Sequence, residues 1–315
     1  MVKRLVVFLV SAILFSSTFA TQPLQKLTVI LDWYPNPDHA PLIIAQQLGF
    51  FKAEGLDVTF ISPTDPNDAP KLVAAQKADI GITYEPTFLE EVDQGLPLID
   101  IGTLIDHPLN CLVVNNASGI HTLQDLKGKR IASTSNGLSG IMIQTMLEKQ
   151  GLKPADVQYI NVHYNLVQAL LSHHVDAATG LMRNVEVPEL KAFGAAITPY
   201  FPEQYGVPNY SELIFISHIN NKNDTRFPRF LAALQQAVNA IHAHPETTWQ
   251  TFSKAYPAAN NEMNHRIWFA TMPYFATYPA NINTKDWLAF AHFMYDHQLI
   301  KHIQPLSRYL ARHSE

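Results

Sequence analysis

Short apolar runs alternate with amphipathic stretches between residues 27 and 104, and this alternation restricts the fold more than any other feature of the sequence. A strand–helix–strand rhythm predicts a parallel sheet with helices on both of its faces. Glycine and proline mark the ends and first turns of the helices. The predicted strands are 27–31, 56–61, 80–83 and 98–104, and the predicted helices are 40–48, 67–76 and 86–95.

The pattern starts afresh near Asn115, which predicts a second α/β lobe with strands at 131–132, 158–162 and 175–179. A further strand, 213–216, is followed by a mostly helical tail that has no new sheet to cover. We therefore expect the chain to cross back, so that the tail packs on the first lobe. The 315 residues also favour two lobes. The expected division is 21–114 plus 215–315 for lobe 1 and 115–214 for lobe 2, joined by a hinge, with mostly parallel sheets in both.

Composition excludes several classes of protein. The net charge is −5 with only 16% charged residues, so no basic surface for nucleic acid is indicated. The 14 histidines are scattered and form no metal motif, and no cofactor is predicted. The single cysteine excludes an intramolecular disulfide framework. Cys111 stands in an apolar run, which favours a buried strand thiol over a catalytic one.

The N-terminus has the pattern of a signal peptide. Lys3 and Arg4 precede an apolar run from 5 to 15, and small residues lead to a cleavage site after Ala20. The run is too short for a typical transmembrane helix, and no second stretch of the sequence is apolar enough to span a bilayer. The sequence therefore predicts an exported chain whose residues 1–20 are removed.

The loop after the first strand, residues 31–39, carries an acid, two aromatic residues, an amide and a histidine. Ligands bind at the carboxyl ends of strands in open α/β sheets, and helix N-termini offer unpaired N–H groups. We predict that Asp32 and Trp33 form one wall of a small-molecule pocket. Trp33 could instead pack in the core, and Asp32 could cap the next helix. His39 either donates to a ligand oxygen or is half-exposed.

Several motifs in this order carry a family resemblance: residues 31–39, 49–58, 81–86, 107–110, 165–171 and 205–213. Across residues 27–217 the chain resembles the thiamine-pyrimidine synthase-like superfamily. Its bacterial members are mostly periplasmic solute-binding proteins of ABC importers, and they bind thiamine pyrimidine precursors such as formylaminopyrimidine. Related members bind riboflavin-like or other aromatic solutes. The resemblance implies a two-lobed periplasmic binding protein fold of type II and a periplasmic location.

The fungal relatives are enzymes that build the pyrimidine from their own histidine and bound pyridoxal phosphate. By resemblance, their cofactor-binding lysine falls at Thr83 and their histidine at Thr87, while their cysteine-rich segment falls near 210–217. Without the lysine no Schiff base forms. We therefore predict no catalytic residues and no enzyme activity.

A binding protein needs flat faces for stacking and a few polar groups that fix orientation. Tyr84 and Tyr210 are further stacking candidates. Glu212, a position to which the resemblance also points, can accept from an aminopyrimidine at two points, or it is a surface residue at a strand start. Glu85 faces the cleft or complements a helix dipole. Asn110 resembles a family position beside the hinge and could bridge the lobes.

The second lobe contributes two candidate segments. Ser135, Gly137 and Leu138 lie in a glycine-containing loop before a helix, where backbone N–H groups would suit an oxyanion, a formyl oxygen or a phosphate. Arg183 and Asn184 follow a strand where the formylaminopyrimidine importers tend to carry aromatic residues. Arg183 either favours an acidic group on the solute or pairs with Glu186 on the surface.

The sequence thus predicts an exported receptor that closes over a small aromatic heterocycle, a thiamine pyrimidine precursor, and delivers it to an ABC permease of the inner membrane. The alternatives are a receptor for another heterocycle such as a flavin, a pyrimidine synthase-like enzyme and a periplasmic sensor. A hydrolase would need a Gly-x-Ser-x-Gly nucleophile motif, and the sequence contains none.

Overall fold

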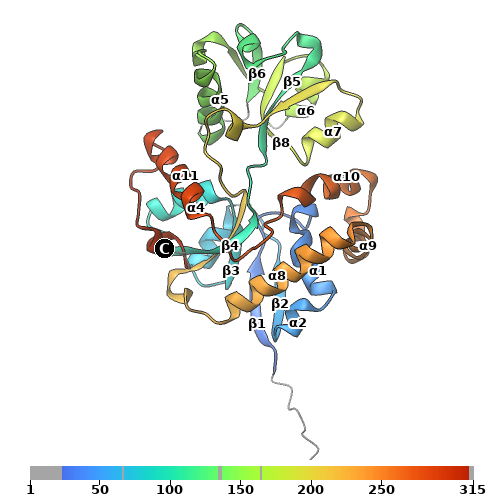
Figure 1. Ribbon diagram of the computed structural model, residues 1–315, viewed down its shortest axis with the longest axis vertical. Helices are drawn as coiled ribbons and strands as arrows, with labels where there is room; N and C mark the ends of the chain where they lie inside the picture. The colour runs from blue at the N-terminus through green and yellow to red at the C-terminus, as the bar shows by residue number, and fades with distance from the viewer. Residues whose placement is uncertain (1–22, 66, 134–136, 164, 312–315) are drawn as a thin grey trace, which may run out of the picture.

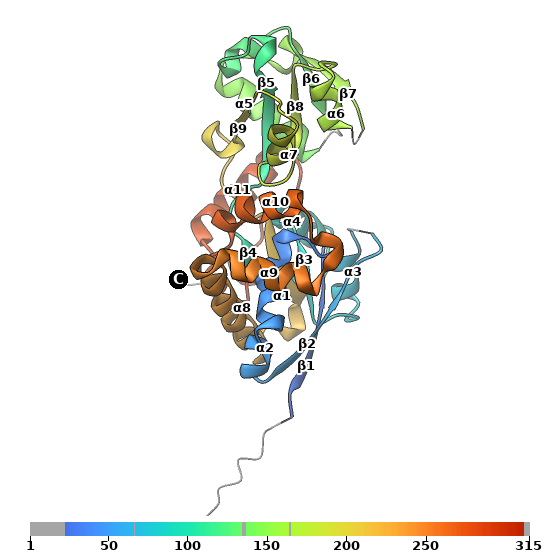
Figure 2. The same cartoon turned by 90° about the vertical axis from the view of Figure 1, so that its right-hand side faces the viewer.

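The computed structural model of the protein describes residues 23–311, apart from residues 66, 134–136 and 164. The described chain forms two α/β lobes that lie one above the other (Figures 1 and 2). The predicted signal peptide, residues 1–20, lies outside the described residues. Within the ranges described, no helix is long and apolar enough to cross a membrane.

The first lobe is built on a mixed sheet with the strand order β2-β1-β3-β10-β4 in the described part of the chain. β1 runs parallel to β2 and β3, as the strand–helix–strand rhythm predicts. β10 reaches this sheet after the second lobe and pairs antiparallel with both β3 and β4. The strands are β1 (Gln25–Ile30), β2 (Leu56–Ile61), β3 (Ile80–Thr83), β4 (Leu98–Ile105) and β10 (Leu213–His218).

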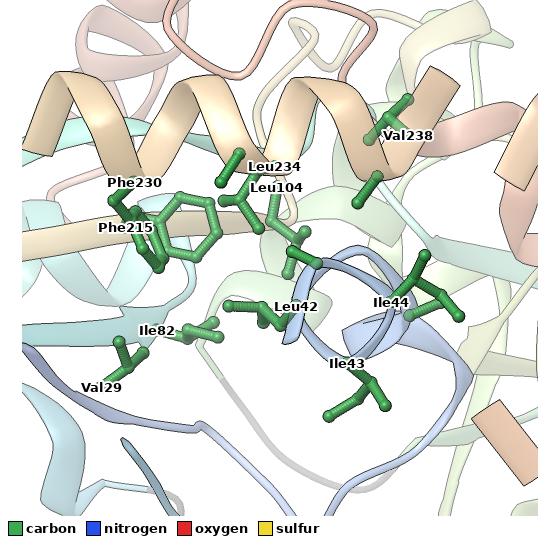
Figure 3. Packing of buried hydrophobic residues seen from close by; sticks show 14 of the residues in the cluster. Val29, Leu42, Ile43, Ile44, Ile82, Leu104, Phe215, Phe230, Leu234 and Val238 are labelled. Carbon is green, nitrogen blue, oxygen red and sulfur yellow. The ribbon is translucent and has the colours of Figure 1, made fainter. Parts of the chain in front are cut away.

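Helices cover both faces of this sheet. On one face, α8 lies across α1, and Phe230 and Leu234 of α8 point toward the apolar side chains of α1 and the sheet (Figure 3). The Phe230 ring lies 5.2 Å from Phe215 of β10, edge to face. The helices of this lobe are α1 (Ala40–Gln47), α2 (Phe50–Ala53), α3 (Asp68–Ala74), α4 (Glu85–Asp93), α8 (Arg226–Ala243), α9 (Pro245–Ala255), α10 (Glu262–Thr271), α11 (Thr284–Asp296) and α12 (Leu306–Tyr309).

The second lobe has its own mixed sheet, with the order β7-β6-β8-β5-β9 among the described strands. β5 is antiparallel to its neighbours β8 and β9. Cys111 lies in β5, where burial raises the pKa of its thiol to about 12. The elements are β5 (Asn110–Asn115), β6 (Arg130–Ser133), α5 (Leu138–Lys149), β7 (Gln158–Asn161), α6 (Leu166–Leu171), β8 (Ala177–Met182), α7 (Glu186–Ala192) and β9 (Ile197–Tyr200).

Two connections join the lobes, residues 106–109 before β5 and residues 201–212 before β10. Strand pairing puts the whole of β5 in the second sheet, five residues before the expected boundary at 115. It also puts β10 in the first sheet from Leu213. We keep the division into two lobes as a proposal, with its crossings moved to these two connections.

Candidate ligand-binding cleft

A cavity of about 310 Å³ lies between the lobes, where the loop after β1 faces the segment after β8. The first lobe contributes residues of the β1 loop, the end of β3 and one face of α10. The second lobe contributes the end of β8 and the start of α7. The lining residues are Asp32, Trp33, Asn36, Pro37, Asp38, Tyr84, Met182, Val185, Glu186, Asn264 and Ile267.

Asp32 and Tyr84 meet because β1 and β3 are adjacent parallel strands that end at the same edge of the sheet. The Tyr84 hydroxyl donates to Asp32 Oδ2 at 3.0 Å. Burial raises the pKa of Tyr84 well above its usual range, and the carboxylate of Asp32 acts in the same direction. The pair therefore presents a fixed polar group on the cavity wall.

His39 lies behind Asp32 and is fully buried, with 0% of its surface exposed. The backbone N–H of Asn36 donates to its Nδ1 at 3.3 Å, which leaves the ring proton on Nε2. Nε2 then donates to Asp32 Oδ1 at 2.8 Å. His39 thus orients Asp32 instead of reaching the cavity, and our expectation that it is half-exposed is wrong. Asn36, not Asp32, caps the 3-10 helix Pro37–His39.

Trp33 is 49% exposed and lines the cavity, so it does not pack in the core. Its ring contacts Tyr34 edge to face, with 5.7 Å between the ring centroids. Tyr34 is more exposed, at 62%, and does not line the cavity. Trp33 therefore offers an aromatic surface for stacking at the mouth of the cleft.

A buried polar contact joins the two lobes beside the cavity. The Asn184 amide, just after β8, donates to Asp38 Oδ1 at 2.7 Å and to Thr271 Oγ1 of α10 at 2.9 Å. The Thr271 hydroxyl itself lies 3.2 Å from Asp38 Oδ1. Burial raises the pKa of Asp38 to about 6. In this arrangement Asn184 holds the lobes together.

Glu212 joins the two connections between the lobes. Its Oε2 accepts from the Leu109 N–H at 2.7 Å and from the Tyr210 hydroxyl at 3.3 Å. Burial raises the pKa of Glu212 to about 7, and the nearby Asp38 carboxylate acts in the same direction. Glu212 is buried, not a surface residue. Tyr210 is also buried, with its ring 4.6 Å from Phe290, so it packs in the core.

Arg183 is locked by contacts within the protein. Its guanidinium donates twice to Glu203, at 2.7 and 2.9 Å, and lies 4.0 Å over the ring of Phe201. It also donates to the Asn110 carbonyl at 3.5 Å. The alternative of a surface pair with Glu186 is not formed, because the guanidinium pairs with Glu203, while Glu186 accepts from the Met182 N–H. This geometry gives Arg183 a positioning role beside the hinge.

Three other predicted residues, Glu85, Gly137 and Leu138, do not line the cleft cavity. Glu85 accepts from the Ser211 N–H and lines a different cavity of the first lobe. Gly137 lines a cavity of about 410 Å³ within the second lobe. Leu138 begins α5 and packs against an apolar cluster that includes Tyr210. Ser135 lies outside the described residues.

Sequence reasoning did not select Asp38, Asn36 or Thr271. A signal for the first two was available, because Asn36 and Asp38 flank a proline directly before the helix and belong to the loop already chosen. Thr271 lies 233 residues from Asp38, and no local pattern connects them.

The cleft therefore combines one exposed aromatic face with several hydrogen-bonding carboxyl groups. This set suits a flat ligand that carries N–H donors. Among the residues that the structure describes, no group of three or more histidine, cysteine or acidic side chains is placed to hold a metal ion.

Residues 36–248 match the family described as NMT1/THI5 like. The chain belongs to this family. It is 40% identical over 286 residues to a Haemophilus influenzae protein whose name assigns it to thiamine biosynthesis, a match that covers 90% of this chain and 91% of that protein. It is 31% identical over 219 residues to the formylaminopyrimidine-binding protein of Halalkalibacterium halodurans, covering 68% and 66% of the two chains.

The NMT1/THI5-like chain is also similar to enzymes. It is 27% identical over 275 residues to a 4-amino-5-hydroxymethyl-2-methylpyrimidine phosphate synthase of Saccharomyces cerevisiae, covering 84% and 80% of the chains. Its fold is that of the periplasmic binding proteins. The structure of the periplasmic aliphatic sulphonate binding protein of Escherichia coli matches with a TM-score of 0.72 at 14% identity, over 91% of this chain and 92% of that one.

Proposed function

We propose that the protein is the periplasmic solute-binding component of an ABC importer and that it captures a thiamine pyrimidine precursor. The observation that carries this proposal is the cavity between the lobes, with the exposed face of Trp33 beside the hydrogen-bonded pair of Asp32 and Tyr84. The similarity to a formylaminopyrimidine-binding protein supports the same class of solute.

The size of the cavity supports a ligand with a single ring. Small-molecule sites usually have volumes of roughly 300–1,000 Å³. The cleft cavity, at about 310 Å³, lies at the lower end of this range. A pyrimidine with short substituents suits this volume better than a flavin, which has three fused rings and a long side chain.

In the proposed mechanism, the ring stacks on Trp33 and its amino group donates to Asp32, whose carboxylate His39 and Tyr84 hold in place. Closure then brings Asn184 of the second lobe onto Asp38 of the first. The ligand shifts the protein toward this closed state, which the permease recognises. No bond of the solute is made or broken.

The synthase is the competing function, because the yeast relatives carry that name. The resemblance places the cofactor-binding lysine of those enzymes at position 83 and their histidine at position 87, and both are threonine here. Thr83 is also buried within β3. Neither hydroxyl can form the Schiff base that the cofactor chemistry needs.

The test is isothermal titration of residues 21–315 with formylaminopyrimidine, hydroxymethylpyrimidine and riboflavin. We expect a pyrimidine to bind. Trp33→Ala should weaken its binding by about 1–3 kcal/mol, the scale of base–aromatic stacking. Tyr278→Ala is the matched control, because it removes an exposed ring that does not line the cavity, and its affinity should stay close to that of the wild type.

Two results would contradict the proposal. If riboflavin binds and neither pyrimidine does, the protein is still a solute-binding protein, but its solute is a flavin. Formation of a pyrimidine product from pyridoxal phosphate, detected by mass spectrometry, would establish the synthase instead.

A further inference from the structure

The side chains that line the cleft cavity carry charge of one sign only. Three carboxyl groups line it, those of Asp32 and Asp38 from the first lobe and that of Glu186 from the second. Among the residues that the structure describes, no lysine, arginine or histidine lines this cavity. The few positions between residues 23 and 311 that the structure does not describe are not basic residues either. This lining favours a negative potential inside the cleft.

The two carboxyl groups of the first lobe are held by uncharged donors. Asp32 accepts from the Tyr84 hydroxyl and from the ring of His39. The His39 ring is uncharged, because its Nδ1 accepts a backbone N–H and its one ring proton is on Nε2. Asp38 accepts from the amide of Asn184. In the described part of the chain, no lysine or arginine forms an ion pair with either carboxyl group.

The second lobe places the carboxyl group of Glu186 at the start of α7, which borders the cavity through Val185 and Glu186. Anions are favoured at helix N-termini, where backbone N–H groups are unpaired. Here the protein supplies the anion itself, because Glu186 Oε2 accepts from the Met182 N–H at 2.7 Å. Its donor is again an uncharged amide. The carboxylate of Glu186 therefore occupies the place on the second lobe that would otherwise suit a phosphate.

The surroundings of Tyr84 are consistent with a negative potential on the opposite wall. Burial is the largest cause that raises the pKa of Tyr84, and the carboxyl groups of three residues act in the same direction. They are those of Asp32, Glu212 and Asp38. A phosphate on a solute in this cavity would meet the same charges. Repulsion between charges acts over several ångströms, so it requires no direct contact with the solute.

We propose that Glu186 is a specificity-determining residue of the cleft, whose carboxylate acts with those of Asp32 and Asp38 to exclude phosphorylated solutes and admit uncharged or cationic heterocycles. This role depends on the proposed function, because it concerns the same cavity. A phosphorylated pyrimidine would have to lose its phosphate before the protein could capture it.

The experiment is isothermal titration of residues 21–315 with 4-amino-5-hydroxymethyl-2-methylpyrimidine and with its phosphate ester. The titrations are made at about pH 8, where Asp38, whose pKa is about 6, is ionised. The measured quantity is the ratio of the two dissociation constants within each variant, because a general loss of affinity cancels in this ratio. The wild type should bind the ester at least about tenfold more weakly than the parent pyrimidine.

Glu186→Gln should bring this ratio at least about threefold closer to one, because it removes a negative charge from the cavity. Glutamine has nearly the volume of glutamate and can still accept from the Met182 N–H, so the change reports charge and not size. Glu148→Gln is the matched control, because it removes the same charge from an exposed position of the second lobe that does not line the cavity. Its ratio should equal that of the wild type.

Equal affinity of the wild type for both compounds, or an unchanged ratio in Glu186→Gln, would overturn this proposal and leave the proposed function intact. An ester that binds neither the wild type nor the variant counts as an unchanged ratio. Binding of neither compound to the wild type would reject the proposed function and this role together.

Circular dichroism checks that Glu186→Gln folds. If it does not, Asp38→Asn takes its place, because it removes another carboxylate from the lining of the cavity. The ratio should again move toward one. An unchanged ratio in that variant would reject the exclusion of phosphate by charge.

Discussion

At the scale of single residues, two hydrogen bonds hold the carboxylate of Asp32 in the wall of the cleft, one with His39 and one from the Tyr84 hydroxyl. Asp32, Trp33 and Tyr84 were predictable because the carboxyl ends of adjacent parallel strands meet at one edge of a sheet. The position of His39 was not, because its burial depends on a contact with Asn36 that only the folded loop creates. The hydrogen-bond partners of Asn184 could not be predicted either, because they lie 146 and 87 residues away along the chain.

The raised pKa of Asp38 leads to a prediction about how the stability of the protein depends on pH. Its pKa is about 6 in the folded protein and about 3.9 for an unfolded aspartate, so between these values the folded state binds a proton that the unfolded state does not. The stability contributed by this group is therefore largest below pH 4 and falls as the pH rises through 6. The total loss is about 2–3 kcal/mol.

Asp38→Asn should remove this part of the pH dependence, because an amide does not titrate in this range. The measurement is urea unfolding of the wild type and the variant at several values of pH from 4 to 7. As the pH rises, the unfolding free energy of the Asp38→Asn variant should increase relative to that of the wild type. Asp57→Asn, an exposed position on β2, serves as the control. A constant difference across the range would contradict the assignment.

At the scale of secondary structure elements, apolar runs bounded by turns were predicted, whereas two elements of the second lobe were missed. The predicted strands 56–61 and 80–83 coincide with β2 and β3, where apolar runs are bounded by turns. β9 and α7 were not predicted. β9 contains Pro199 and has one buried residue, Tyr200, and α7 contains Pro188 and only two buried residues. Elements of this kind depend on tertiary packing for their stability.

The hydrogen bonds from Asn184, just after β8, to Asp38 before α1 and to Thr271 at the end of α10 lead to a prediction about lobe closure. Asn184→Ala removes both amide hydrogen bonds across the lobes, so the open state should become more populated. Small-angle X-ray scattering of the ligand-free variant should show a larger radius of gyration than the wild type. Thr198→Val removes an exposed hydrogen bond to Asn116 within the second lobe and should leave the radius unchanged. Equal radii for Asn184→Ala and the wild type would show that this contact does not control closure.

At the scale of the whole molecule, two α/β lobes were expected, but the direction of individual strands was not. Each described sheet contains one strand that runs against its neighbours, β10 in the first and β5 in the second. Both strands adjoin the connections between the lobes. A local strand–helix rhythm cannot show this, because strand direction at a crossover depends on where the chain re-enters a sheet.

The place of β10 between β3 and β4 predicts an order of folding. The second sheet is formed by one continuous segment, 110–200, whereas β3 and β4 gain their shared neighbour only from residues 213–218. Contacts between distant residues form more slowly than local ones. In refolding followed by pulsed hydrogen exchange, the amides of β6 and β8 should gain protection before or together with those of β3 and β4. Earlier protection of β3 and β4 would contradict this order.

A ribosome delivers the chain from its N-terminus, so β1 to β4 emerge first and yet cannot join into a finished sheet. Until residue 218 has been synthesised, the facing edges of β3 and β4 have no strand between them, and unpaired edges of this kind are sites of aggregation. A nascent chain that stalls within the second lobe, or one translated from a truncated mRNA, would therefore expose an incomplete first sheet that is prone to aggregate. Chaperones and proteases should therefore act on incomplete chains of this protein more than on finished ones.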